Sequence, residues 1–225
     1  MSSGRQVERG EGPHARRALD VTSVRTAARG FATAVGGGRR AALADWVTAD
    51  QTSGRITGTW GYYIMIKKLA KMAELTGHAD DAARYQALAG DIKNAFNAHF
   101  YNQELRRYTS TGNAGTAGAT QTAQALALDA GLVPDNERQA VLDALVELVY
   151  AYHPNGEGPH FSGGTIGMAP TVRALADGGR DDVLWDLLQG DDQPSYGFFM
   201  QSTTANPGGM TTIGEQWNRG ASKTT

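Results

Sequence analysis

Apolar residues recur every three to four positions over most of the chain from Trp60 onward, which is the spacing of amphipathic helices. Three such stretches end at glycines, Gly77, Gly131 and Gly178, and resume a few residues later beside aspartates, which suit a helix N-terminus. The apolar stripes are Tyr62, Ile66, Leu69 and Ala73; Tyr85, Leu88, Ile92 and Phe96; Val141, Leu145, Leu148 and Tyr152; and Val183, Leu184 and Leu187. The pattern predicts three helical hairpins.

The three glycines lie 54 and 47 residues apart, which indicates a repeat of about fifty residues. A helical hairpin cannot bury its apolar face alone, so the hairpins must stack, either as an open α-solenoid or as a closed toroid. The loops at 101–120, 153–164 and 190–215 are long and rich in Gly, Thr, Trp and Tyr, which favours the toroid. We expect an all-α fold with short extended pieces only near Arg107–Thr109 and Gly197–Gln201.

The first 44 residues differ from the rest of the chain. They hold eight arginines against three acidic residues, few large apolar side chains and a Gly-Gly-Gly run at 36–38. Such a segment buries too little apolar surface to offset its ordering entropy. We therefore expect a disordered or non-native leader over residues 1–40 and a partial helical domain over residues 41–225. A nucleic-acid-binding arm is the alternative.

Composition narrows the function classes. A formal net charge of -2 and a pI near 6.2 argue against nucleic-acid and membrane-surface partners. The sequence shows neither a signal peptide nor an apolar run long enough to span a membrane, which slightly favours the cytoplasm. Without cysteine there is no disulfide or thiolate metal site, and the five histidines show no metal-ligand spacing.

One carboxylate stands among small hydroxyls and an aromatic ring near the C-terminal end. Glu215 lies between Thr211, Thr212 and Trp217 in a loop-like setting. Sugar C–H groups stack on aromatic faces, while a carboxylate serves as acid, base or nucleophile in glycoside hydrolysis. The pattern is compatible with a sugar site, although on spacing alone it is more often a surface glutamate beside a core tryptophan.

Several motifs resemble those of bacterial α-L-rhamnosidases, in the order of that family. Pro194-Ser-Tyr-Gly197 and Thr211-Thr-Ile-Gly-Glu-Gln-Trp217 are similar to its Pro-Ser-Trp-Gly and Thr-Thr-Ile-Trp-Glu-Arg-Trp. Ala44-Asp-Trp46 resembles its Gly-Asp-Trp, and His160-Phe-Ser-Gly-Gly-Thr-Ile-Gly167 its His-Leu-Ser/Thr-Thr-Gly segment. The stretch 121–134 is similar to a helix and turn of the family, so the resemblance covers about residues 41–222.

The resemblance implies an (α/α)6 toroid and inverting hydrolysis of terminal α-L-rhamnosides, with Glu215 as general base. The partner would be a rhamnose-containing glycan or glycoside, and no cofactor is needed. The residues expected to bind the sugar are Asp45, Trp46, His160, Tyr196 and Trp217.

The chain also departs from the family pattern. Tyr196 and Gly214 replace tryptophans, and Gln216 replaces an arginine. The acidic loop that supplies the family's general acid has no counterpart in residues 1–44, and the hairpin expected after Trp217 is missing. We therefore expect about half of a toroid, weakly active, that self-associates through its exposed edges. The alternatives are another six-hairpin glycosidase and a non-catalytic helical scaffold or sugar-binding fragment.

Overall fold

The computed structural model describes residues 44–45, 48–154, 158–201 and 209. The predicted leader, Trp46, Glu215 and Trp217 lie outside these residues. The elements in chain order are α2 (Gly54–Leu75), α3 (Ala79–Phe100), β1 (Tyr101–Asn102), β2 (Arg107–Tyr108), the 3-10 turn η1 (Gly112–Ala114), α4 (Gln121–Asp129), the 3-10 turn η2 (Asp135–Glu137), α5 (Arg138–Ala151), α6 (Met168–Asp177), α7 (Asp181–Gln189) and α8 (Tyr196–Met200).

The three predicted hairpins are α2–α3, α4–α5 and α6–α7, and their corners share one geometry. A left-handed glycine follows the first helix of each pair: Gly77 (φ 78°), Gly131 (φ 71°) and Gly179 (φ 70°). The residue after each glycine donates its backbone N–H to the carbonyl five positions before it: His78 to Ala73 at 2.8 Å, Leu132 to Ala127 at 2.9 Å and Arg180 to Leu175 at 2.8 Å. This is the Schellman motif, which only glycine adopts without strain. At the third corner it uses Gly179, whereas the sequence pattern pointed to Gly178.

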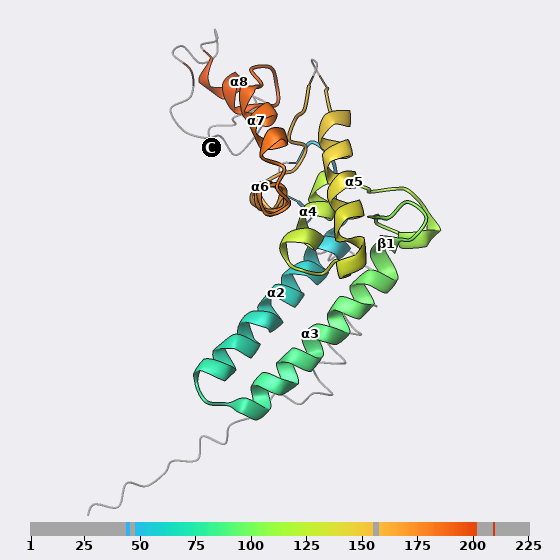
Figure 1. Ribbon diagram of the computed structural model, residues 1–225, viewed down its shortest axis with the longest axis vertical. Coiled ribbons are helices and arrows are strands. Elements are labelled where there is room, and N and C mark those ends of the chain that lie inside the picture. The colour runs from blue at the N-terminus through green and yellow to red at the C-terminus, as the bar shows by residue number, and fades with distance from the viewer. Residues whose placement is uncertain (1–43, 46–47, 155–157, 202–208, 210–225) are drawn as a thin grey trace, which may run out of the picture. The chain divides into compact units, whose positions relative to one another are not determined.

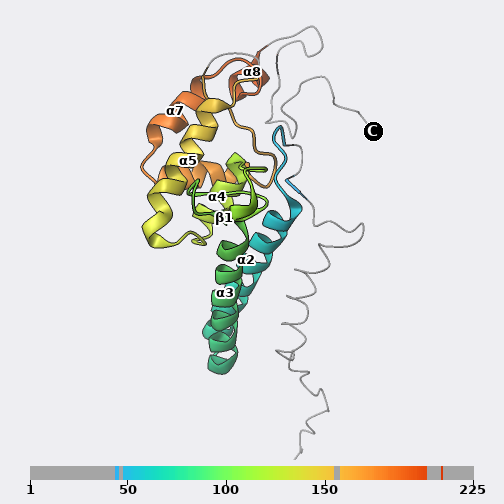
Figure 2. The same ribbon diagram turned by 90° about the vertical axis from the view of Figure 1, so that its right-hand side faces the viewer.

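The core is centred on α4, which contacts α2, α5 and α6 (Figure 1). Its residues Ala123, Ala125, Leu126 and Ala127 are fully buried. Alanines let neighbouring helices approach closely, and the buried leucine fills the space between them. The pair α2 and α3 lies side by side in both views (Figure 2). Its shared core includes Ile66, Ala89, Ile92 and Phe96.

The first helix begins earlier than its apolar stripe indicates. It starts at Gly54, because Ser53 caps it by accepting a hydrogen bond from the Arg55 amide at 3.3 Å. The expected extended piece at Arg107–Thr109 is confirmed in part by β2, which pairs antiparallel with β1. The expectation for Gly197–Gln201 is wrong, because this stretch is helical in α8. Ser195 caps that helix by accepting from the Phe198 amide at 3.0 Å.

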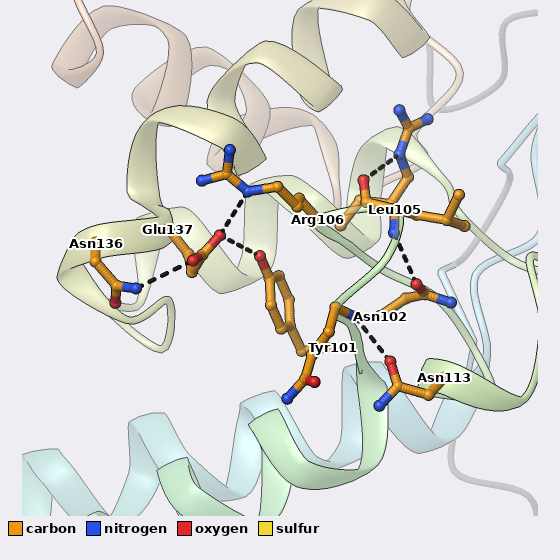
Figure 3. A network of polar contacts seen from close by, with 9 residues as sticks. Tyr101, Asn102, Leu105, Arg106, Asn113, Asn136 and Glu137 are labelled. Atoms are coloured by element: carbon orange, nitrogen blue, oxygen red, sulfur yellow. Dashed lines mark hydrogen bonds and ion pairs between the residues drawn. The ribbon is translucent and has the colours of Figure 1, made fainter.

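A polar network fastens the β1–β2 hairpin to the start of α5 (Figure 3). Glu137 Oε2 accepts hydrogen bonds from the Tyr101 hydroxyl at 2.6 Å and from Arg106 Nε at 2.9 Å, and Glu137 Oε1 accepts from Asn136 Nδ2 at 3.0 Å. The hydrogen bonds from Tyr101 and then Arg106 lower the pKa of Glu137. Burial and then the Glu137 hydrogen bond raise the pKa of Tyr101 to about 12. The network therefore holds the hairpin while Glu137 is ionised and Tyr101 is protonated.

Several large apolar side chains stay exposed. They include Met65, Met72 and Leu75 on α2 and Trp185 and Leu188 on α7. Contiguous exposed apolar surface commonly marks an interface. Within the described residues no helix is both long and apolar enough to cross a membrane.

Candidate functional site

The segments that precede α2, α4 and α6 meet at one end of the hairpins. The side chains of Thr52 and Thr120, each just before a helix, form a hydrogen bond with their hydroxyl oxygens 2.6 Å apart. The carbonyl of Ser162 accepts from the Ala49 amide at 3.0 Å and from the Thr48 hydroxyl at 2.8 Å. This loop end contains most of the described residues that the sequence singled out for chemistry.

Asp45 is buried in this loop end, with 3% of its surface exposed. Its Oδ2 accepts from the Thr122 hydroxyl at 2.7 Å and the Gly164 amide at 2.8 Å. Its Oδ1 accepts from the amides of Ile166 at 2.9 Å and Gly167 at 3.3 Å. A carboxylate has about four acceptor sites, so these four donors occupy its capacity. Asp45 therefore holds the 160–167 loop on α4.

Glycines make this close approach possible. A Cβ at Gly167 would lie 2.0 Å from Thr122 Oγ1 and 2.7 Å from Asp45 Oδ2. A Cβ at Gly163 would lie 3.0 Å from the same Thr122 oxygen. The backbone of the loop reaches the Asp45 carboxylate only because these positions carry no side chain.

Two buried glutamines on α4 hold the neighbouring backbone in place. Gln121 donates its Nε2 to the His160 carbonyl at 2.9 Å, and its Oε1 accepts from the Ser162 amide at 3.0 Å. Gln124 likewise bonds both the N–H and the carbonyl of Tyr108, at 2.7 and 2.8 Å. Each amide side chain pairs with the main chain as a neighbouring strand would. Buried amides are expensive unless paired, so both loops are held in one position.

The His160 side chain lies between two acceptors. Its Nε2 is 2.8 Å from Asp192 Oδ1, and its Nδ1 is 3.1 Å from the Gly158 carbonyl oxygen. Only 1% of the imidazole is exposed, against 32% of the Asp192 side chain. The pair joins the 158–167 loop to the segment between α7 and α8.

Tyr196, the first residue of α8, packs on the same loop. Its ring meets Phe161 edge to face with centroids 6.0 Å apart, and its hydroxyl donates to Met168 Sδ at 2.8 Å. Burial raises the pKa of the Tyr196 hydroxyl. A partly buried tyrosine at a loop end offers an apolar face and a polar tip, the combination that stacks on a sugar ring.

A second carboxyl group, Asp50, lies in the segment before α2. Its amide donates to the Ser162 carbonyl at 3.3 Å, and burial raises the pKa of its carboxyl group. Burial and then the charge of Asp50 also raise the pKa of Tyr152. A carboxyl group with a raised pKa keeps its proton to higher pH, which suits acid–base chemistry.

The structure thus brings together three of the residues predicted to bind sugar, Asp45, His160 and Tyr196. Direct contact with a sugar remains a prediction for all three, and for the predicted site residues outside the described part. Sequence reasoning missed Asp50 and Asp192, which carry no motif of their own. Among the described residues no cluster of three or more His, Asp or Glu could hold a metal ion.

Comparison with known proteins gives consistent matches. Residues 17–225 match the family described as the bacterial alpha-L-rhamnosidase 6 hairpin glycosidase domain. An alpha-L-rhamnosidase of Streptomyces avermitilis is 30% identical over 175 residues, covering 77% of this chain and 15% of the relative. One of Formosa agariphila is 28% identical over 185 residues, covering 78% and 18%.

Solved structures match as well. The alpha-L-rhamnosidase of Streptomyces avermitilis, solved in complex with L-rhamnose, aligns with a TM-score of 0.60 and 28% identity, over 79% of this chain and 16% of that one. The alpha-L-rhamnosidase from Dictyoglumus thermophilum aligns with a TM-score of 0.66 and 25% identity, over 89% and 22%. The chain spans less than a quarter of the length of each of these relatives.

Proposed function

We propose that this chain supplies part of a glycoside hydrolase acting on terminal α-L-rhamnosides, because it belongs to the family of bacterial alpha-L-rhamnosidase six-hairpin glycosidase domains. Family membership also decides the architecture. The three hairpins are part of a six-hairpin helical toroid rather than of an open solenoid. The observation that carries the proposal is the family match over residues 17–225.

The loop end supports a sugar site. It joins Asp45, His160 and Tyr196 on segments that precede successive helices. In helical scaffolds, long loops at one end commonly carry the function, since the helices below hold them rigidly. We propose that the aromatic side chains of Trp46, Tyr196 and Trp217 wall the pocket and stack on the ring of the sugar.

The reaction we propose is inverting hydrolysis. Glu215 removes a proton from a water molecule as the water oxygen attacks the anomeric carbon and the glycosidic C–O bond breaks. A second carboxyl group protonates the departing oxygen, roughly 6.5 to 9.5 Å from the first so that the water fits between them. The family resemblance implies an acid from a loop upstream of the Asp-Trp motif, and residues 1–44 hold no counterpart of that loop. Acid–base chemistry at an acetal needs no cofactor.

Release of 4-nitrophenol from a panel of aryl glycosides tests the substrate class. Aryl glycosides are the substrates of choice, because an aryl leaving group depends least on the general acid. Among them we expect turnover of the α-L-rhamnoside and of no other sugar. Proton NMR of the first product should show the β-anomer, since an inverting enzyme reverses the α-configuration. Turnover of a different sugar alone would indicate another glycosidase, and sugar binding without turnover a non-catalytic fragment.

Substitution of the proposed base tests the mechanism. Glu215→Gln should lower turnover of the aryl rhamnoside by about 10²- to 10⁴-fold, the usual contribution of a general base, with little change in rhamnose affinity. Glu157→Gln is the matched control, because Glu157 is the other loop glutamate near a family motif. Equal turnover in the two variants would remove Glu215 from the mechanism.

A further inference from the structure

The His160 backbone is fixed from the side of α4 and α5. Its N–H donates to the Val149 carbonyl at 3.3 Å, and its carbonyl accepts from Gln121 Nε2 at 2.9 Å. Because both backbone groups are held by helices of the core, the imidazole projects from a rigid base. What this ring binds is therefore held by the scaffold as well.

The ring binds Asp192, a residue of the segment between α7 and α8. Both imidazole nitrogens lie within hydrogen-bond distance of protein acceptors, Asp192 Oδ1 and the Gly158 carbonyl, and the ring is almost fully buried. Both ring nitrogens are thus engaged by protein atoms in this structure. His160 therefore holds the neighbouring segment.

The segment that Asp192 anchors leads directly to Tyr196. Two further contacts tie it to the same loop, the Phe161–Tyr196 ring pair and the Tyr196–Met168 hydrogen bond. Ser195, between them in sequence, is buried and caps α8. The contact between His160 and Asp192 is the one in this set that gives the buried imidazole a side-chain acceptor, and a buried polar group left without a partner is destabilising.

The geometry points to Asp192 as a positioning residue, which through His160 clamps the segment carrying Tyr196 to the 158–167 loop. The role of this clamp in sugar binding rests on the proposed function, because Tyr196 is one wall of the proposed sugar pocket. The clamp joins two loops of the site that lie about thirty residues apart in the chain. Its effect on a sugar is indirect and is transmitted by the position of the tyrosine ring.

The two oxygens of Asp192 make its conservative variant informative. Asp192 Oδ2 is buried without a hydrogen-bond partner among the described residues. In Asp192→Asn the amide oxygen can therefore take the place of Oδ1 and face His160. The NH₂ group then takes the place of Oδ2, where it meets no hydrogen-bond donor among the described residues. Asp192→Ala loses the acceptor altogether and leaves a buried imidazole N–H unpaired. We expect the asparagine variant to retain most of the clamp and the alanine variant to lose it.

Amide hydrogen exchange of the full chain tests the clamp. Asp192→Ala should speed exchange at the amides of residues 192, 193, 195 and 196 by at least about tenfold, because the side-chain acceptor of the buried His160 ring is lost, while α2 and α3 exchange as before. Asp192→Asn should stay close to the wild type. Asp191→Ala is the matched control, since it removes a neighbouring, exposed carboxylate. Equal exchange in the Asp192→Ala and Asp191→Ala variants would overturn the inference.

L-rhamnose titrations of the same proteins, followed by NMR, test the purpose of the clamp. We expect Asp192→Ala to weaken rhamnose binding by at least about fivefold and Asp192→Asn to restore it, a rescue that simple loss of stability would not produce. Unchanged affinity in Asp192→Ala, with a wild type that binds, would overturn the inference. If the wild type does not bind rhamnose, the proposed function has failed, and the exchange comparison decides the clamp by itself.

Discussion

Replacing Asp45 should destabilise the chain more than replacing any exposed carboxylate. Asp45→Ala leaves the Thr122 hydroxyl and the amides of Gly164, Ile166 and Gly167 without their acceptor. Each buried donor left unpaired costs about 1–3 kcal/mol. Ile166 is partly exposed, and the hydroxyl can rotate to another partner, so the four costs do not add in full. We expect a loss of about 3–5 kcal/mol in the free energy of unfolding, as for other broken buried charge contacts.

Asp45→Asn should cost about 2–4 kcal/mol despite its equal size, since its NH₂ group must face N–H or O–H donors. This sets Asp45 apart from Asp192, where the same change is expected to be mild. Asp91→Asn is the matched control, because Asp91 is exposed on α3 and should change stability by less than about 0.5 kcal/mol. Urea unfolding followed by circular dichroism gives all three values.

A loss of less than about 1 kcal/mol in Asp45→Ala would refute this reasoning. It would mean that water or a neighbouring group replaces the carboxylate without cost. Amide exchange at residues 164–167 provides the local check, because these donors should exchange faster than the core of α4 in the variant. Uniform acceleration over the whole chain would point instead to a purely global loss of stability.

Four further predictions concern packing, the acid and alkaline limits of stability, and association. Gly167→Ala should lower the free energy of unfolding by about 2–3 kcal/mol, because the new Cβ would lie 2.0 Å from a threonine oxygen. Gly90→Ala should raise it by about 0.5–1 kcal/mol, because Gly90 lies within α3 and a Cβ there meets no atom within 4 Å. Thermal unfolding compares the two variants. Because the pKa of Glu137 is lowered in the folded state, its carboxylate stabilises the fold at pH values above the ordinary pKa of 4.5. Stability should therefore fall as the pH drops from 4.5 through the lower, folded pKa, and Glu137→Gln should make this fall less steep in acid titrations. The raised pKa of Tyr101 should make stability fall as pH rises from 10 through about 12, and Tyr101→Phe should remove the part of this loss that Tyr101 contributes. Sedimentation velocity should show concentration-dependent self-association that Trp185→Gln weakens, and a monomer at all concentrations would contradict it.

Much of the helical scaffold could be predicted from the sequence, because helices and their ends are local. The apolar stripes and the corner glycines indicated the three hairpins, and the structure confirms them. The predictions that differ in detail involve signals weaker than periodicity. A serine cap starts α2 before its first apolar residue, and another turns the expected extended piece at 197–201 into α8.

The sequence by itself determined the hairpin repeat and, through its ordered motifs, the family of this chain. The tertiary structure alone decided what the motif residues touch. Asp45 stands beside a predicted pocket tryptophan in sequence, yet its four hydrogen-bond donors come from positions 77 to 122 residues away. Asp192 matches no motif and binds His160 across 32 residues. Helix periodicity reports which face is buried, but a hydrogen bond depends on the distance and angle between two groups, which exist only once the loops have folded together.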